Sequence, residues 1–180
     1  MMAGAYVAQE GAMPIRLRNV EQNRPWTFVE WLQGKPLGHP SHPLFVHFPI
    51  AFYTATLVFD VMTRIEPNPG LVQAGTFLLV GAAAATVILV TTGLIDWWGM
   101  VKGSSKRRVA TWHLLFQVVA FAFFFTTLLL RFPDRTAAQA ETLWITLEAI
   151  GFVVLSVGQY LGGVLVYEKG MRVRTGGAVD

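Results

Sequence analysis

The chain contains no cysteine and few charged residues. The absence of Cys from all 180 residues excludes disulfide bonds, thiolate-held iron–sulfur clusters and covalently attached c-type haem. A metal or redox centre would therefore depend on His, Met, carboxylate or backbone ligands. Charged residues make up only 14% of the chain and hydrophobic residues 53%, with a mean hydropathy of +0.47. Water-soluble domains carry far more charge than this, so the composition indicates an integral membrane protein.

The sequence also lacks the pattern of a secretory leader. Residues 1–24 are small, polar and mixed in charge, and no basic segment there precedes an apolar run. We therefore expect no cleavable signal peptide. The pI of about 9.5 and the net charge of +3 are compatible with nucleic-acid binding. However, the basic residues flank apolar segments, which is typical of charges that orient a chain in a bilayer, and we expect no nucleic-acid partner.

Four apolar segments are each long enough to cross a bilayer. The sequence predicts an all-α, polytopic membrane protein, an up-and-down bundle of four transmembrane helices. Polar turns at 66–70, 102–108 and 132–135 separate the predicted helices. We expect an N-terminal segment at 1–43, with a short interfacial or surface helix over 25–32, a transmembrane domain at 44–167 and a tail at 168–180. The predicted helices span residues 44–64, 72–95, 109–130 and 143–167.

The basic residues are distributed unequally between the two sides of this bundle. With four spans, the N-terminus, the second loop and the C-terminus lie on one side, which carries 11 of the 14 Lys and Arg residues, including Arg16, Arg172 and Arg174. The other side has only three Lys or Arg residues, which are Arg64, Arg131 and Arg135. The positive-inside rule therefore predicts that both termini are cytoplasmic, in a multi-pass protein of a bacterial inner membrane.

Histidines gather at the cytoplasmic end of the predicted bundle. His39 and His42 each precede a proline, which favours extended backbone, so we expect them in a loop. His47 and His113 each lie about one turn inside a predicted helix, at similar depth. Ionisable groups in a membrane usually face the bundle interior or a polar site. The alternative for each histidine is an interfacial side chain that bonds to a loop carbonyl.

The histidines are the candidate ligands. His47 and His113 are placed to bind a b-type haem from both faces, and a metal site would draw on His47, His113, His42 and His39, with Asp96 ending the second span nearby. Gln117 follows His113 by four residues and shares its helix face. It is a candidate cofactor-binding residue that orients a ligand, or else it bonds to a neighbouring helix.

Charged and small residues mark two further features of the bundle. Asp60, Arg64 and Glu148 lie toward the opposite end, where we expect a structural cluster with Arg131 or Arg135 rather than a proton or quinone site. Gly151, Gly158 and Gly162 form a line on the fourth span. Such a line lets a helix approach closely, either from inside the bundle or from another chain.

Four motifs resemble one known family. They are Gly-His-Pro-x-His-Pro-Leu-x-Val-His-Phe-Pro-Ile at 38–50, Gly-Leu-Ile-Asp-Trp at 93–97, Arg-Arg-x-x-x-x-His at 107–113 and Gly-Gly-x-Leu-Val-Tyr at 162–167. They are similar to a four-helix bacterial membrane family that is catalogued only as a domain of unknown function, with some members fused to Rieske-type ferredoxin domains. The resemblance implies a redox neighbourhood. The chain departs from the family at 168–170, where members often have His, and at Gln117, where they have Asn.

These features predict a small electron-transfer subunit of a respiratory or photosynthetic membrane complex, non-catalytic in itself, that holds haem b near the cytoplasmic face. Its expected partners are the lipid bilayer and other membrane subunits, including a Rieske-type or cytochrome protein. The alternative is a cofactor-free accessory subunit. A transporter is disfavoured because the spans are uninterrupted and no internal repeat or mid-membrane charge is evident.

Overall fold

The computed structural model describes residues 18–19 and 24–171. The chain divides into two compact units, 1–41 and 42–180, which are described separately. Arg16, Arg172, Arg174 and most of the predicted C-terminal tail lie outside the described residues.

The first unit is built from short elements. Strands β1 (Arg18–Asn19) and β2 (Arg24–Pro25) pair antiparallel, and they are followed by helix α1 (Phe28–Leu32) and the 3-10 helix η1 (Lys35–Leu37). Thr27 caps α1: its hydroxyl accepts from the Glu30 amide, and the Glu30 carboxylate accepts from the Thr27 amide at 2.9 Å. Arg24 adds a bidentate ion pair to Glu30, at 2.8 and 3.0 Å. The short helix predicted over 25–32 is therefore present.

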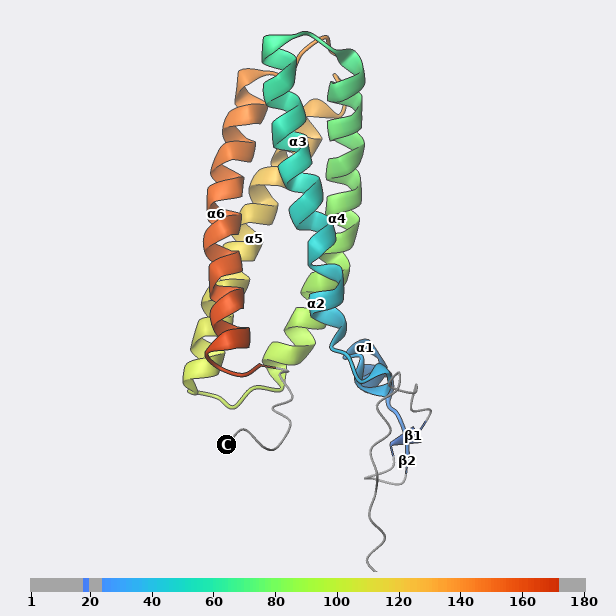
Figure 1. The fold of residues 1–180 in the computed structure, drawn as a ribbon, viewed down its shortest axis with the longest axis vertical. Helices are drawn as coiled ribbons and strands as arrows, with labels where there is room; N and C mark the ends of the chain where they lie inside the picture. The colour runs from blue at the N-terminus through green and yellow to red at the C-terminus, as the bar shows by residue number, and fades with distance from the viewer. Residues whose placement is uncertain (1–17, 20–23, 172–180) are drawn as a thin grey trace, which may run out of the picture. The chain divides into compact units, whose positions relative to one another are not determined.

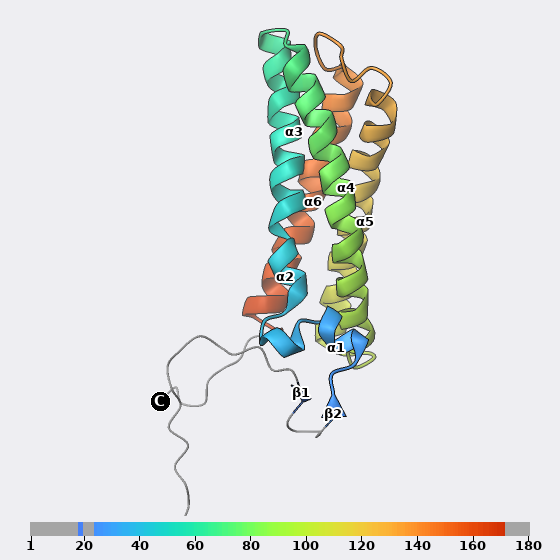
Figure 2. The same cartoon turned by 90° about the vertical axis from the view of Figure 1, so that its right-hand side faces the viewer.

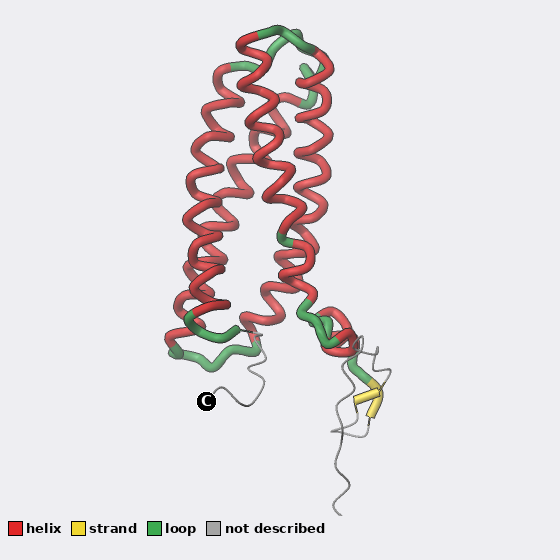
Figure 3. The backbone as a smooth tube through the Cα atoms, in the orientation of Figure 1, coloured by secondary structure: helices red, strands yellow, loops and turns green. Residues whose placement is uncertain are grey.

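The second unit is a bundle of long antiparallel helices (Figure 1). Helix α2 (Ser41–Phe45) leads into α3 (His47–Ile65) through Val46, whose backbone stays helical at φ −62° and ψ −27°. Figure 2 shows the same helices from the side, and Figure 3 shows the short turns that join them. The predicted four-helix membrane fold is confirmed. The other three helices are α4 (Pro69–Trp98), α5 (Ser105–Arg131) and α6 (Thr142–Tyr167).

Local sequence explains where the helices begin. Asn68 caps α4 by accepting from the amides of Gly70 and Leu71, and Pro69 occupies the first helical position, where its missing N–H is not needed. Ser104 caps α5 by accepting from the Arg107 amide at 3.2 Å. As a result, each of these helices begins three or four residues earlier than the hydropathy pattern predicts.

The prediction that His42 lies in extended loop backbone is wrong. His42 is the second residue of α2, and Pro43 is the third. A proline in the first turn removes an N–H that has no helical partner, so it costs the helix nothing there. This tolerance outweighs the steric preference of the preceding residue for extended backbone. His39, in contrast, is outside any helix, as predicted.

The outer surface of the bundle is apolar. Phe77, Val87 and Val153 are 57%, 62% and 63% exposed, and each of the four long helices carries similar residues. An apolar surface this extensive fits lipid rather than water as the surrounding medium. The four helices are also long and apolar enough to cross a membrane.

Aromatic and small residues fill the interior. Tyr53 of α3 stacks on Phe124 of α5 with ring centroids 4.0 Å apart. The glycine line of α6 faces α5 of the same chain: a Cβ on Gly151 would lie 3.0 Å from Cβ of Phe123, and one on Gly158 would lie 3.2 Å from Cβ of Phe116. The glycines therefore serve close packing inside the bundle, the first of the two expected uses.

Candidate functional site

A cavity of about 430 Å³ lies at the end of the bundle that carries the α4–α5 loop. This volume falls within the usual range of cofactor and small-molecule sites. All four long helices and α2 contribute to its lining, which is mostly apolar. The polar side chains among the lining residues are His42, His47, Tyr53, Thr86, Asp96, Trp97, His113, Gln117, Gln159 and Tyr167.

His42 of the short helix α2 is held against α4. Its Nδ1 lies 3.1 Å from the carbonyl oxygen of Leu89 and 3.2 Å from the hydroxyl of Thr92. A carbonyl oxygen can only accept, so Nδ1 carries the ring proton. In the neutral ring, Nε2 then keeps the lone pair that a metal requires.

His113 is held in the same way against α6. Its Nδ1 donates to the carbonyl oxygen of Gly158 at 2.7 Å. Metal-binding histidines usually donate their other ring N–H to a carbonyl or carboxylate, which fixes the tautomer and the orientation of the ring. Both histidines have this arrangement.

Two glycines make room for the two imidazole rings. A Cβ on Gly93 would lie 3.1 Å from Cε1 of His42, and a Cβ on Gly162 would lie 3.1 Å from Cε1 of His113. In each case the glycine follows the bonded carbonyl by four residues, one turn along the same helix. Each ring therefore rests on helix backbone, in a space that a side chain would fill.

The other predicted ligands occupy different positions. His47 lies in the first turn of α3, lines the cavity and is exposed. Gln117 also lines it, and its Nε2 is buried without a hydrogen-bond partner among the described residues. His39 belongs to the first unit, which is not placed relative to the cavity.

A multi-ligand site for a bare metal ion has little support in this arrangement. Within residues 18–19 and 24–171, no three His, Asp or Glu side chains come together as potential ligands. A haem iron needs only two protein ligands, one on each face of the macrocycle. His42 and His113 are the two histidines whose rings are oriented by carbonyl bonds.

The equivalence of these histidines extends along both helices. Residues 42–60 align with residues 113–131 at a constant offset of 71, and seven of the 19 positions are identical. This correspondence was not evident when the sequence was considered alone. The similarity is hard to recognise in the sequence because α4 and α6, the helices that follow the two aligned segments, share little sequence with each other. The identical pairs are His42/His113, Leu44/Leu115, Phe45/Phe116, Ala51/Ala122, Phe52/Phe123, Thr56/Thr127 and Leu57/Leu128.

The repeat is also visible in the contacts. Tyr53 stacks on Phe124, which is its own counterpart at the offset of 71. Asp60 likewise pairs with its counterpart Arg131. In a two-fold arrangement, a residue touches its counterpart only near the axis. The hairpins α3–α4 and α5–α6 are therefore related by an approximate two-fold axis along the bundle, with His42 and His113 as an equivalent pair.

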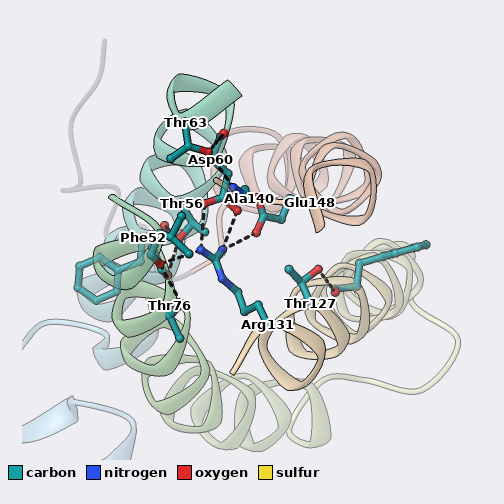
Figure 4. Close-up of polar contacts among 12 residues, drawn as sticks. Phe52, Thr56, Asp60, Thr63, Thr76, Thr127, Arg131, Ala140 and Glu148 are labelled. Carbon is teal, nitrogen blue, oxygen red and sulfur yellow. Dashed lines mark hydrogen bonds and ion pairs between the residues drawn. The ribbon is translucent and has the colours of Figure 1, made fainter. Parts of the chain in front are cut away.

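A buried charge cluster lies toward the other end of the bundle (Figure 4). Arg131 donates to both oxygens of Asp60, at 2.7 and 2.9 Å, to Oε1 of Glu148 at 3.1 Å and to the Val72 carbonyl at 2.9 Å. The predicted grouping of Asp60 and Glu148 with a guanidinium group is confirmed, and Arg131 supplies that group. Arg64 instead donates to the Ala140 carbonyl, and Arg135 donates to the Phe132 carbonyl.

Sequence reasoning missed several parts of the cavity. It overlooked the carbonyls of Leu89 and Gly158 and the role of Gly93, because backbone partners leave no side-chain signature. It undervalued His42 because of the proline that follows. One sequence feature could have identified the two histidines as a pair. His42 and His113 stand 71 residues apart, and each packs against a glycine, Gly93 or Gly162.

Comparison with known proteins gives a family and nothing more specific. No curated protein matches the chain, and no solved structure matches it. One family model, described as "Predicted membrane protein (DUF2231)", matches residues 38–175. This match covers both hairpins, the cavity and the charge cluster, and the chain therefore belongs to the membrane protein family DUF2231.

Proposed function

We propose that the protein is a small electron-transfer subunit of a membrane complex and that it binds one b-type haem in the cavity, where His42 and His113 would hold the iron. The observation that carries this proposal is that the two imidazole rings share the same tautomer and the same kind of hydrogen bond. Each donates Nδ1–H to a helix carbonyl and keeps Nε2 as a potential ligand atom. The sequence predicted His47 as the partner of His113. The carbonyl bond and the equivalence by repeat favour His42 instead.

Several features of the cavity fit a haem. Its lining is largely apolar, as a macrocycle buried in a membrane protein requires. Gly93 and Gly162 leave space at the imidazole edges. Arg107 lies 4.2 Å from the ring of Trp97, a lining residue, and offers a cation of the kind that pairs with the carboxylates of haem.

A bound haem would supply one-electron transfer. The chain supplies the remaining functions. His42 and His113 would hold the iron, and the apolar lining would exclude water and adjust the reduction potential. Gln117 has a buried amide N–H available for a bound group.

Absorption spectroscopy of the purified protein tests the proposal. We expect the reduced-minus-oxidised spectrum of a six-coordinate b-type haem. His42→Ala and His113→Ala should each abolish this spectrum or convert it to a five-coordinate, high-spin form. His47→Ala is the matched control, because His47 lines the same cavity without a carbonyl bond, and it should retain the wild-type spectrum.

Two results would contradict the proposal. A haem signal that survives His42→Ala and disappears in His47→Ala would identify His47 as the ligand. The complete absence of haem from the wild-type protein, both as purified and after addition of haemin, would favour the cofactor-free accessory subunit.

We also propose that the cavity lies at the cytoplasmic side of a bacterial inner membrane. Arg131 is one of the three basic residues on the opposite side, and it is buried in an ion-pair cluster. Only Arg64 and Arg135 then remain near that surface, which strengthens the charge bias. Reporter fusions after Pro69 and Asp134 should both report the periplasmic side. A cytoplasmic signal from either fusion would reverse the orientation.

A further inference from the structure

The charge cluster contains one cation and two carboxyl groups. Arg131 of α5, Asp60 of α3 and Glu148 of α6 are all 0% exposed. The adjacent helix α4 contributes the Val72 carbonyl to Arg131. The nearest other cations, Arg64 and Arg135, donate to backbone carbonyls rather than to these carboxyl groups. With both carboxyl groups ionised, the cluster would carry one uncompensated negative charge inside the bundle.

The two carboxyl groups are bound unequally. Both terminal nitrogens of Arg131 donate to the Asp60 carboxylate in a bidentate ion pair, at 2.7 and 2.9 Å. Glu148 accepts a single bond through Oε1 at 3.1 Å, and its Oε2 is buried with no hydrogen-bond partner among the residues that the structure describes. An ionised carboxylate with a bare oxygen in a membrane interior is among the costliest groups a protein can bury. Asp60 is thus the closer counterion of Arg131, and Glu148 shares the same cation through one longer contact.

We propose that the cluster is a proton-binding site, with the proton on Oε2 of Glu148. The bound proton brings the net charge of the three groups to zero and removes the bare anionic oxygen. Oε1 of the neutral carboxyl group still accepts the bond from Arg131. The site is independent of the haem proposal, because it is built from other residues at the other end of the bundle.

The position of the cluster allows exchange with the aqueous phase. Arg131 is the last residue of α5, and Asp60 lies five residues before the end of α3. Above them, Thr63 donates to the Asp60 carbonyl and accepts from the Ala140 amide, so the α5–α6 loop covers the cluster. A proton leaving Glu148 therefore has only about one to two helical turns to cross to this surface.

Infrared spectroscopy of the full chain in lipid nanodiscs tests the proposal. At neutral pH we expect the C=O stretching band of a protonated carboxyl group, shifted in heavy water. Labelling the wild-type protein with carbon-13 glutamate should move this band, and labelling with carbon-13 aspartate should not. These two measurements need no variant and so do not depend on the folding of a mutant.

Two variants sharpen the assignment. Glu148→Gln should lose the band, whereas Glu66→Gln, in the exposed α3–α4 turn, should retain it. Asp60→Asn should also lose the band, because Glu148 then becomes the counterion of Arg131 and ionises. Absence of the band from the wild-type protein at neutral pH would overturn the proposal. A band that moves with labelled aspartate would overturn it as well, by assigning the proton to an aspartate.

Discussion

Asp60 and Arg131 occupy the same position in the two halves of the bundle, and they pair with each other. They stand 71 residues apart, at the offset that also relates His42 to His113, and two bonds of 2.7 and 2.9 Å join them. At this position one hairpin carries the anion and the other the cation. The pair therefore holds the hairpins together and also distinguishes them, because two copies of either hairpin would bring like charges together.

A charge exchange tests this relationship. Arg131→Met removes the cation, leaves a buried carboxylate unpaired and should destabilise the bundle by about 3 to 5 kcal/mol. Asp60→Leu leaves Glu148 as the counterion of Arg131, so it should cost less. The double reversal Asp60→Arg with Arg131→Asp restores opposite charges across the axis. We expect it to recover at least half of the loss seen in the single reversals, measured by thermal unfolding in detergent as a double-mutant cycle. Additive losses without recovery would show that the two positions are not equivalent.

The sequence predicted those parts of the fold that depend on long-range averages. Hydropathy over about 20 residues identified all four helices, and the charged residues near the ends predicted the cluster around Arg131. Positions that depend on a single backbone contact were not predictable. The carbonyl of Leu89 orients His42, but a carbonyl is present at every residue and so gives no signal. The proline after His42 pointed the wrong way, because its effect depends on whether the helix begins before or after it.

The tautomers of the two cavity histidines provide a second prediction. Both rings donate from Nδ1 to a carbonyl, so nitrogen-15 NMR of histidine-labelled protein without haem should show the Nδ1–H form for His42 and His113. Thr92→Val should perturb only His42, whose Nδ1 it contacts at 3.2 Å. If both rings show the Nε2–H form, which is the more common one in solution, the carbonyl bonds are absent and the case for ligation fails.

The N-terminal unit should respond to acid through Glu30. The side-chain hydrogen bond from Arg24 is the largest cause that lowers the pKa of Glu30 from 4.5 to about 2, and the Thr27 amide adds to it. A carboxyl group whose pKa is lower in the folded than in the unfolded chain stabilises the folded form when it is ionised. The contribution of Glu30 is therefore complete above about pH 4.5 and is lost as the pH falls toward 2. Carbon-13 NMR of the Glu30 carboxyl group should show this low midpoint.

The control for this prediction is Arg24→Gln. This change removes the ion pair and leaves the Thr27 capping bonds, so the midpoint for Glu30 should rise but stay below 4.5. A midpoint that does not move would show that the capping bonds alone account for the shift.

The glycine line of α6 gives the last prediction, through two substitutions of the same kind. Alanine is favoured over glycine within a helix by about 1 kcal/mol. At Gly163 the added Cβ would meet only Tyr167, at 3.9 Å, so Gly163→Ala should raise the Tm. At Gly151 it would lie 3.0 Å from Cβ of Phe123 and 3.1 Å from the ring of Phe124, which is 1% exposed and cannot move aside.

Overpacking of this kind costs about 1 to 3 kcal/mol, more than the helix gains, so Gly151→Ala should lower the Tm. Thermal unfolding of both variants in the same detergent separates the effect of helix propensity from the effect of side-chain packing. If both substitutions raise the Tm, α5 does not lie against Gly151, and the line of glycines would be available to a helix of another chain. A fall at Gly151 with a rise at Gly163 would show that the glycines hold α5 and α6 together, the contact through which Gly158 and Gly162 position His113.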